Sequence, residues 1–468
     1  MSISLQHAEH GNPLLNAASK VFRTYLPELR SPTLLPDAKW SLAGILFSVF
    51  GGLAAVKVIA IFIPKAEFGR ASLVLGVVGL LTLLMVNPLL TAHLRLYFDH
   101  MGSGRAENYF QGLLLGVGIL STVCYTLFAI LGRSRGNGLY LGLVLPAALL
   151  LLVQPYANAT NNYLEGQRLY RPLAFASLLL KTSPVIFLLG LLVTGMSGAY
   201  CIILSQALAA LALVLVFAHR RPRAQQPNVG SSGLEETPGS AGLARRFAGG
   251  IYLASFFGWV LTTSDRYVVG HYLSLSAVGI YAMNYGLWSL PYQMLNGWLD
   301  TVTRSRIYAR AAHSDWPALT RSLWLRVVAG LAAASAGTIL LCLIGKRIAF
   351  MLLGESYWSS WKLMAFIAAG HIFFVIGSSA VTVLFAMKNT RVLSLANVAG
   401  AMVNVLLNIY LIPRWGILAA GATTFLCYVL WASILLAGTV FLTSRLKARQ
   451  QAELTAGPIC AARVLVEP

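Results

Sequence analysis

The sequence has few charged residues for its length. Of its 468 residues, 11% are charged and 57% are hydrophobic, whereas a soluble domain carries about 25% charged residues. Acidic residues are the scarcest, with 15 Asp and Glu against 35 Lys and Arg, so the net charge is +20. This shortage excludes a water-soluble enzyme and a disordered chain, and it predicts a membrane protein.

Patterns that hold metals or nucleotides are also missing. The five cysteines (Cys124, Cys201, Cys342, Cys427 and Cys460) form no C-x-x-C pair, so we expect neither a metal centre nor a disulfide framework. No G-x-x-x-x-G-K-[ST] sequence occurs, which argues against an ATP-driven pump in one chain. No signal peptide precedes the first long apolar run. We therefore expect a protein without cofactors that is not an enzyme.

Long apolar runs are present instead. A membrane-spanning helix needs about 20 mostly apolar residues, and twelve segments fit. The first six cover residues 40–64, 72–92, 110–131, 138–158, 173–193 and 198–218, and the last six cover residues 247–270, 277–299, 325–345, 361–387, 392–413 and 416–442. Polar residues 262–266 interrupt the seventh segment. The pattern predicts an all-α polytopic membrane protein with about twelve transmembrane helices.

The basic residues outside these spans gather on one side. If the N-terminus is cytoplasmic, 23 of the 35 Lys and Arg lie in cytoplasmic tails and loops and seven lie on the opposite side. This is the positive-inside asymmetry of membrane proteins. It predicts that both termini are cytoplasmic, and it explains most of the basicity without nucleic acid as a partner.

A Pro-, Gly- and Ser-rich stretch divides the spans into two halves. The predicted organisation is a cytoplasmic tail (1–39), an N-lobe (40–218), a cytoplasmic linker (219–246), a C-lobe (247–442) and a cytoplasmic tail (443–468). Gly69 and Gly76 at the second span have the same spacing as Gly279 and Gly286 at the eighth. Six spans in each half predict parallel repeats, a common transporter design with the substrate site between the halves.

Four stretches also carry a family resemblance. Residues 68–72 (FGRAS) and 92–97 (AHLRLY) flank the second span, and residues 263–288 begin TSDRYVVGHY. Residues 384–424 contain spaced Asn residues, then LIPRWGILAAGA. In order and spacing they resemble the polysaccharide-biosynthesis flippases of the multidrug/oligosaccharidyl-lipid/polysaccharide (MOP) superfamily, over about residues 40–442.

The resemblance implies a V-shaped fold of two six-helix lobes that opens to one side at a time. It also implies translocation of an undecaprenyl-diphosphate-linked oligosaccharide across the bacterial inner membrane, for surface polysaccharide or exopolysaccharide synthesis. The expected partners are then this lipid-linked glycan, membrane lipids and other polysaccharide assembly proteins. A multidrug or ion antiporter of the same superfamily, a membrane polymerase and an export component remain alternatives.

Three cations lie inside predicted spans: Lys57, Lys181 and Arg266. A charge at the centre of a span costs about 2.5–3.5 kcal/mol on insertion scales, so such residues usually face a cavity or a partner. We expect them to line the lumen and to bind the diphosphate or acidic sugars. The alternatives are that Lys57 reaches outward past Pro64 and that Arg266 forms a structural ion pair.

Several other polar residues inside the spans are candidates. Asp265 and His371 are candidates for ion coupling, or alternatively for structural hydrogen bonds. Asn397, Asn404 and Asn408 fall on one helix face, where they either bind sugar hydroxyls or join helices. Further polar candidates are Gln154, Asn158, Gln206, Asn284, Gln293 and Asn296. Asp300 and Arg304, four residues apart, are expected to pair with each other at the membrane interface.

Overall fold

The computed structural model describes residues 34–90, 104–134, 138–166, 169–218 and 240–455, and within them the chain is built of helices. The first half contains α2 (Leu34–Phe62), α3 (Lys65–Leu81), the π-helix η1 (Thr82–Val86), α5 (Gly104–Ser134), the 3-10 helix η2 (Leu141–Leu143), α6 (Val144–Gly166), α7 (Tyr170–Leu192) and α8 (Gly198–Ala218). The second half contains α9 (Ser240–Tyr272), α10 (Leu275–Ala312), α11 (Trp316–Tyr357), α12 (Trp361–Ala386), α13 (Arg391–Trp415) and α14 (Ile417–Thr455). Each predicted span overlaps one α-helix in chain order, so the all-α prediction is confirmed.

Two of these helices are less apolar than the others. Over the described residues, ten helices are long and apolar enough to cross a membrane by length and composition, and α9 and α10 are not among them. Both are long enough, with 33 and 38 residues, because about 20 residues suffice. Their polar residues are covered by protein, as Asp265 (1% exposed) and Asn284 (0% exposed) show. A helix surrounded by other helices tolerates such residues, whereas one in contact with lipid does not.

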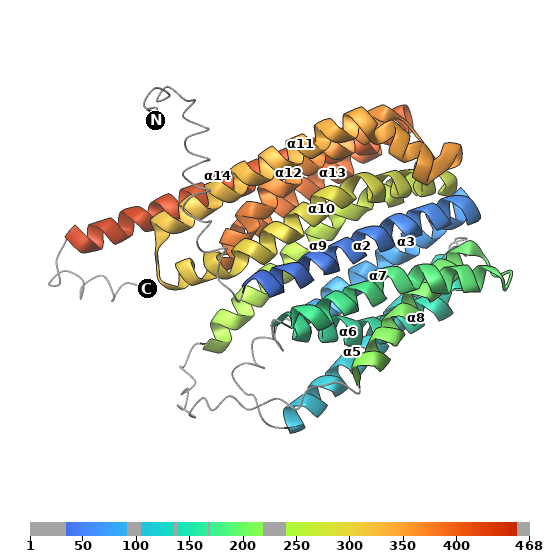
Figure 1. Ribbon diagram of the computed structural model, residues 1–468, viewed down its shortest axis with the longest axis horizontal. Helices are drawn as coiled ribbons and strands as arrows, with labels where there is room; N and C mark the ends of the chain where they lie inside the picture. Colours follow the sequence, from blue (N-terminus) through green and yellow to red (C-terminus); the bar gives the residue numbers. More distant parts are fainter. Residues whose placement is uncertain (1–33, 91–103, 135–137, 167–168, 219–239, 456–468) are drawn as a thin grey trace, which may run out of the picture.

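The helices form two lobes that repeat the same packing (Figure 1). In the N-lobe α2 packs on α7 and α6 packs on α8, and in the C-lobe α9 packs on α13 and α12 packs on α14. The two lobes come together at the right of Figure 1 and diverge toward the left, which is the expected V-shaped arrangement. The weak sequence repeat therefore corresponds to a structural repeat.

Each lobe runs between two ends, which we call proximal and distal. α2 begins and α14 ends at the proximal end, and the turns that follow α2, α9 and α11 lie at the distal end (Figure 1). Capping residues keep these turns short: Ser274 Oγ accepts a hydrogen bond from the backbone N–H of Ala277 (3.1 Å) at the start of α10. Gly416 ends α13 with a φ of 63°, a left-handed conformation that glycine adopts without steric cost.

Several helices extend beyond the predicted spans. α2 begins at Leu34, α9 begins at Ser240 inside the predicted linker, and α14 continues to Thr455 inside the predicted tail. Hydropathy marks the stretch that lies in hydrocarbon, whereas a helix continues into water as long as its backbone hydrogen bonds form. The rest of the predicted tails and linker, residues 1–33, 219–239 and 456–468, lies outside the described residues.

The lobes touch each other at the distal end. α3 and α10 cross so closely that a Cβ atom on Gly69 would lie 1.9 Å from the carbonyl oxygen of Leu275, and one on Gly279 would lie 2.0 Å from that of Lys65. Tyr357 also donates a hydrogen bond across the lobes to the carbonyl of Ile63 (2.9 Å). Small residues permit this approach of two backbones. The equivalent glycines of the two repeats therefore meet one another.

Candidate substrate cavity

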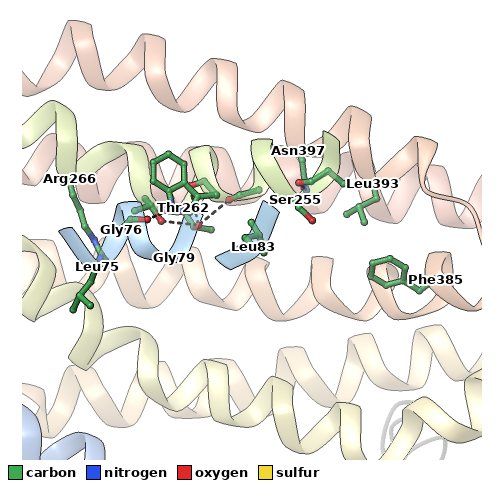
Figure 2. Close-up of a pocket in the computed structure, with 14 residues that line it drawn as sticks. Leu75, Gly76, Gly79, Leu83, Ser255, Thr262, Arg266, Phe385, Leu393 and Asn397 are labelled. Atoms are coloured by element: carbon green, nitrogen blue, oxygen red, sulfur yellow. Dashed lines mark hydrogen bonds between the residues drawn. The ribbon is translucent and has the colours of Figure 1, made fainter. Parts of the chain in front are cut away.

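A cavity of about 490 Å³ lies between the lobes. It is bounded by α3 and η1 of the N-lobe and by α9, the end of α12 and the start of α13 of the C-lobe (Figure 2). It is lined by Leu75, Gly76, Gly79, Leu83, Ala254, Ser255, Gly258, Trp259, Thr262, Thr263, Arg266, Phe385, Leu393 and Asn397. Phe385 and Leu393 mark its proximal end, and Arg266 marks its distal end.

Arg266 supplies the charge of this cavity. Among the fourteen lining residues it is the charged one, and none is a carboxylate. Its guanidinium donates a hydrogen bond to Ser72 Oγ (3.3 Å) and lies over the ring of Tyr285, 5.6 Å from the centroid. Its Nε is buried and has no hydrogen-bond partner. A partly unsatisfied cation in a mostly apolar cavity is suited to an anionic group, since charge-assisted hydrogen bonds are the strong ones.

Two hydrogen bonds from α9 cross to α3 of the N-lobe beside the cavity. Trp259 Nε1 donates to the backbone carbonyl of Gly76 (3.0 Å), and the Tyr267 hydroxyl donates to that of Leu73 (2.8 Å). A Cβ on Gly76 would lie 2.5 Å from the Tyr267 hydroxyl, so glycine is needed for this contact. These bonds join the two lobes along the wall of the cavity.

The two lysines predicted for the lumen are not among the cavity-lining residues. Lys57 Nζ donates to the carbonyl of Met351 on α11, which makes it a bond between the lobes. Lys181 is exposed on α7, and its ammonium group bonds to no residue in the part of the chain that the structure describes, while its own carbonyl packs against Gly51 of α2. Of the three predicted cations, the structure brings only Arg266 into the cavity.

Asp265 is buried on the other side of α9 from the cavity. Its carboxylate accepts hydrogen bonds from the hydroxyl of Tyr281 and from the backbone N–H of Arg266 (2.8 Å). Tyr281 in turn lies 3.3 Å from Thr424 Oγ1. Adjacent residues of a helix point in different directions, so Asp265 enters the C-lobe interior whereas Arg266 enters the cavity.

His371 also lies inside the C-lobe. It is 1% exposed, and its Nδ1 is 2.8 Å from the carbonyl of Ile367. Its ring packs against those of Tyr285 and Tyr428, each with a centroid 5.4 Å away, and the hydroxyls of these tyrosines are 2.8 Å apart. Because Tyr285 also contacts Arg266, the aromatic cluster connects His371 to the wall of the cavity.

The predicted asparagine stripe of α13 serves mainly to join helices. Asn397 donates to the carbonyl of Ala254 (2.6 Å) and accepts from Trp431 Nε1 (2.6 Å). Asn404 Oδ1 accepts from Ser264 Oγ (3.1 Å) and from Asn408 Nδ2 (2.9 Å). Both Asn404 and Asn408 are fully buried, and Asn397 alone of the stripe reaches the cavity lining.

An ion pair at the proximal end of the C-lobe was only half predicted. Asp300 pairs with Arg304 (3.1 Å), as the spacing indicates, and also with Arg326 of α11 (2.5 Å). Arg326 is 2% exposed and also donates to Thr303 Oγ1 (2.9 Å). The first partner follows from the helical repeat, whereas the second depends on how α10 and α11 pack.

Trp259 of the cavity was likewise not predicted, because its position in an apolar run carries no signal.

The comparisons with known proteins agree with this architecture. The family described as "Polysaccharide biosynthesis protein" matches residues 58–362, which is 305 of the 468 residues and includes parts of both lobes. The chain belongs to this polysaccharide biosynthesis protein family. No curated protein matches the sequence.

Solved structures show the same fold at low sequence identity. "Lipid II flippase MurJ, inward closed conformation" is 15% identical, with a TM-score of 0.64 over 86% of this chain and 87% of that one. An inward-facing multidrug resistance MATE family transporter of the MOP superfamily is 14% identical, with a TM-score of 0.61 over 92% and 99%. A MOP superfamily transporter from Pyrococcus furiosus is 12% identical, with a TM-score of 0.54 over 88% and 92%. This polysaccharide biosynthesis protein therefore has a MOP-type transporter fold.

Proposed function

We propose that this polysaccharide biosynthesis protein is a flippase for undecaprenyl-diphosphate-linked oligosaccharide repeat units in the bacterial inner membrane. The observation that carries the proposal is the cavity between the lobes, in which Arg266 is the charged lining residue and no carboxylate opposes it. A diphosphate headgroup cannot cross about 30 Å of hydrocarbon without replacement of its hydration. Arg266 and the lining hydroxyls supply donors for this purpose.

The lobes undergo alternating access in this proposal. From the positive-inside pattern we expect the proximal end to lie in the cytoplasm, so the cavity extends from the cytoplasmic end of the lobes toward Arg266, while the α3–α10 crossing and the Tyr357–Ile63 bond close the distal end. Rocking of the lobes breaks these distal contacts and exposes the cavity to the opposite leaflet. Other polysaccharide assembly proteins are the expected partners at that leaflet.

Asp265 and His371 are the proposed sites of ion coupling. The carboxylate of Asp265 is hydrogen-bonded to the backbone N–H of Arg266, so proton or cation binding at this carboxylate alters the helix segment that carries the substrate anchor. His371 contacts the same segment through Tyr285. The alternative of a multidrug extruder fits less well, because a cavity with an arginine and no lining carboxylate repels cationic drugs.

Replacement of Arg266 by glutamine tests the proposed function. Glutamine keeps hydrogen-bond donors but removes the charge, and the loss of a charge-assisted bond to phosphate costs about 1.5–3 kcal/mol, or roughly ten- to a hundredfold in affinity. We expect flipping of undecaprenyl-diphosphate-linked disaccharide by the reconstituted protein to fall by at least tenfold. Flipping is measured in proteoliposomes from the fraction of the sugar that a membrane-impermeant oxidant reaches.

The matched control is Arg414→Gln. Arg414 is exposed at the distal end of α13, where it contacts Tyr410 and is remote from the cavity lining. This variant should flip the lipid at the wild-type rate. Failure of the wild-type protein to flip the lipid would overturn the proposed function, and wild-type flipping by Arg266→Gln would overturn the role of Arg266.

A further inference from the structure

A second set of polar side chains lies on α6 of the N-lobe. Gln154, Asn158, Asn161 and Asn162 are spaced by four, three and one residues, which places them on one face of the helix. We call them the amide stripe. It begins twelve residues before the end of α6 at Gly166, a depth of about 18 Å at 1.5 Å per residue. The stripe therefore reaches from the proximal end well into the span.

The amide stripe has no hydrogen-bond partner among the described residues. Its four side chains are half-buried and make no hydrogen bond with any residue in the described parts of the chain, and Asn161 Oδ1 is fully buried with none. Neighbouring polar groups of the same helix are bonded: the Tyr156 hydroxyl donates to the carbonyl of Gln111 (3.2 Å), and Thr160 donates to that of Tyr156 (2.9 Å). Each asparagine of the α13 stripe, in contrast, makes at least one hydrogen bond to another helix or to its neighbour in the stripe, although Asn404 Nδ2 and Asn408 Oδ1 are buried without a partner.

Unpaired amides inside a span need a polar occupant. Burial of an amide without a hydrogen bond costs about 1–3 kcal/mol by mutational measurements, and Asn397, which bonds to Ala254 and Trp431, shows that this fold can pair such a group. Polar residues that stay unpaired at this depth usually face water or a ligand. The stripe thus marks a polar surface within the N-lobe.

The helix that carries the stripe lies close to the cavity. The π-helix η1 packs against α6 on one side and against α9 on another, and Leu83 of η1 lines the cavity. A π-helical turn inside an α-helix occurs often at functional sites. A ligand anchored at Arg266 that extends past η1 reaches α6.

The chemistry of the stripe differs from that of the cavity. Each amide offers two N–H donors and one carbonyl acceptor and carries no charge. A phosphate group only accepts hydrogen bonds, whereas a sugar hydroxyl both donates and accepts. Paired donors and acceptors without charge therefore match hydroxyls, and Arg266 matches phosphate.

We infer that the amide stripe of α6 binds the hydroxyl groups of the glycan, while Arg266 binds the diphosphate. This inference rests on the proposed function and assigns the sugar-recognising surface to the N-lobe. It predicts that the protein prefers a sugar-bearing polyprenyl diphosphate to the bare lipid, and that this preference depends on α6.

The test compares two lipids and two proteins. Full-length wild-type protein and the double variant Asn158→Leu/Asn162→Leu are placed in nanodiscs, and binding of undecaprenyl diphosphate, with and without a linked disaccharide, is measured by native mass spectrometry. We expect the variant to bind the disaccharide lipid about tenfold more weakly, as the loss of two hydrogen bonds implies. Its affinity for the bare lipid should equal that of the wild type.

Stability measurements separate binding from folding. Because the stripe bonds to no residue that the structure describes, leucine at these positions should leave the melting temperature unchanged or raise it. Asn404→Leu, the matched control on α13, should lower it, since Asn404 is hydrogen-bonded to Ser264. The variant Asn158→Gln/Asn162→Gln retains the amides and should retain the preference for the disaccharide lipid.

Each possible result of the lipid-binding experiment bears on a different claim. An unchanged preference for the disaccharide lipid in the leucine variant would overturn the inference and leave the proposed function standing. Equal affinity of the wild-type protein for both lipids would also overturn it. Wild-type protein that binds neither lipid would overturn the proposed function itself, and the inference with it.

Discussion

Replacement of Gly69 by alanine is expected to prevent closure of the distal end and to reduce transport by at least tenfold. The added Cβ would lie 1.9 Å from the carbonyl oxygen of Leu275 and 2.9 Å from the backbone nitrogen of Gly279. Both atoms belong to the backbone of α10, so no change of rotamer relieves the overlap. The helices must move apart, and the nearby bond from Tyr357 to Ile63 then stretches.

A control substitution separates this overlap from other effects of alanine. Gly286 is the repeat-related partner of Gly76 on α10, and a Cβ there would meet nothing within 4 Å. Alanine is favoured over glycine inside a helix by about 1 kcal/mol, so Gly286→Ala should be neutral or stabilising. Gly279→Ala should behave like Gly69→Ala, because its Cβ would lie 2.0 Å from the carbonyl oxygen of Lys65.

Distances between the two lobes provide the measurement. Spin labels at Met196 and Leu273, both exposed at distal turns, are introduced into a protein whose five cysteines are replaced by alanine. Pulsed electron spin resonance should show a longer distance between the labels in Gly69→Ala than in the unsubstituted protein or Gly286→Ala. An unchanged distance together with wild-type flipping would show that the crossing is not needed in the transport cycle.

The fold could be predicted largely from hydropathy, for a physical reason. A helix in hydrocarbon satisfies its own backbone hydrogen bonds, so each long apolar run specifies one element, and the twelve runs gave twelve helices in order. The case of α9 shows the limit of this argument. Its polar stretch around Asp265, which is buried inside the C-lobe, weakens the apolar signal, and its beginning at Ser240 lies beyond the apolar run.

The candidate site was less predictable, because hydropathy gives the depth of a residue and not its direction. Lys57 and Arg266 are both inside spans, yet one bonds to the carbonyl of Met351 and the other lines the cavity. The rotation of each helix about its axis decides between these outcomes. Close packing sets that rotation, as the contact of Gly51 with the Lys181 carbonyl shows, and the hydropathy pattern does not reveal which helices meet.

Replacement of Arg326 by methionine is expected to destabilise the C-lobe by about 3–5 kcal/mol, the usual cost of removing one partner from a buried ion pair. Arg326 has a side chain that is 1% exposed, and that of its partner Asp300 is 19% exposed. Methionine fills a similar volume, so the main change is the loss of positive charge beside the carboxylate. Arg304 remains, but its side chain is 47% exposed, and an exposed pair contributes only about 0–1 kcal/mol.

The Arg326 prediction can be checked with a compensating change. In the double variant Arg326→Met/Asp300→Leu no buried charge is left unpaired, and replacement of a buried pair by apolar residues is often neutral or stabilising. Thermal unfolding of the purified protein should therefore show a lower midpoint for Arg326→Met and a largely restored one for the double variant. If the double variant is less stable than either single variant, the hydrogen bonds of Asp300 to Thr382 and of Arg326 to Thr303 hold α10, α11 and α12 together more than the charge pair does.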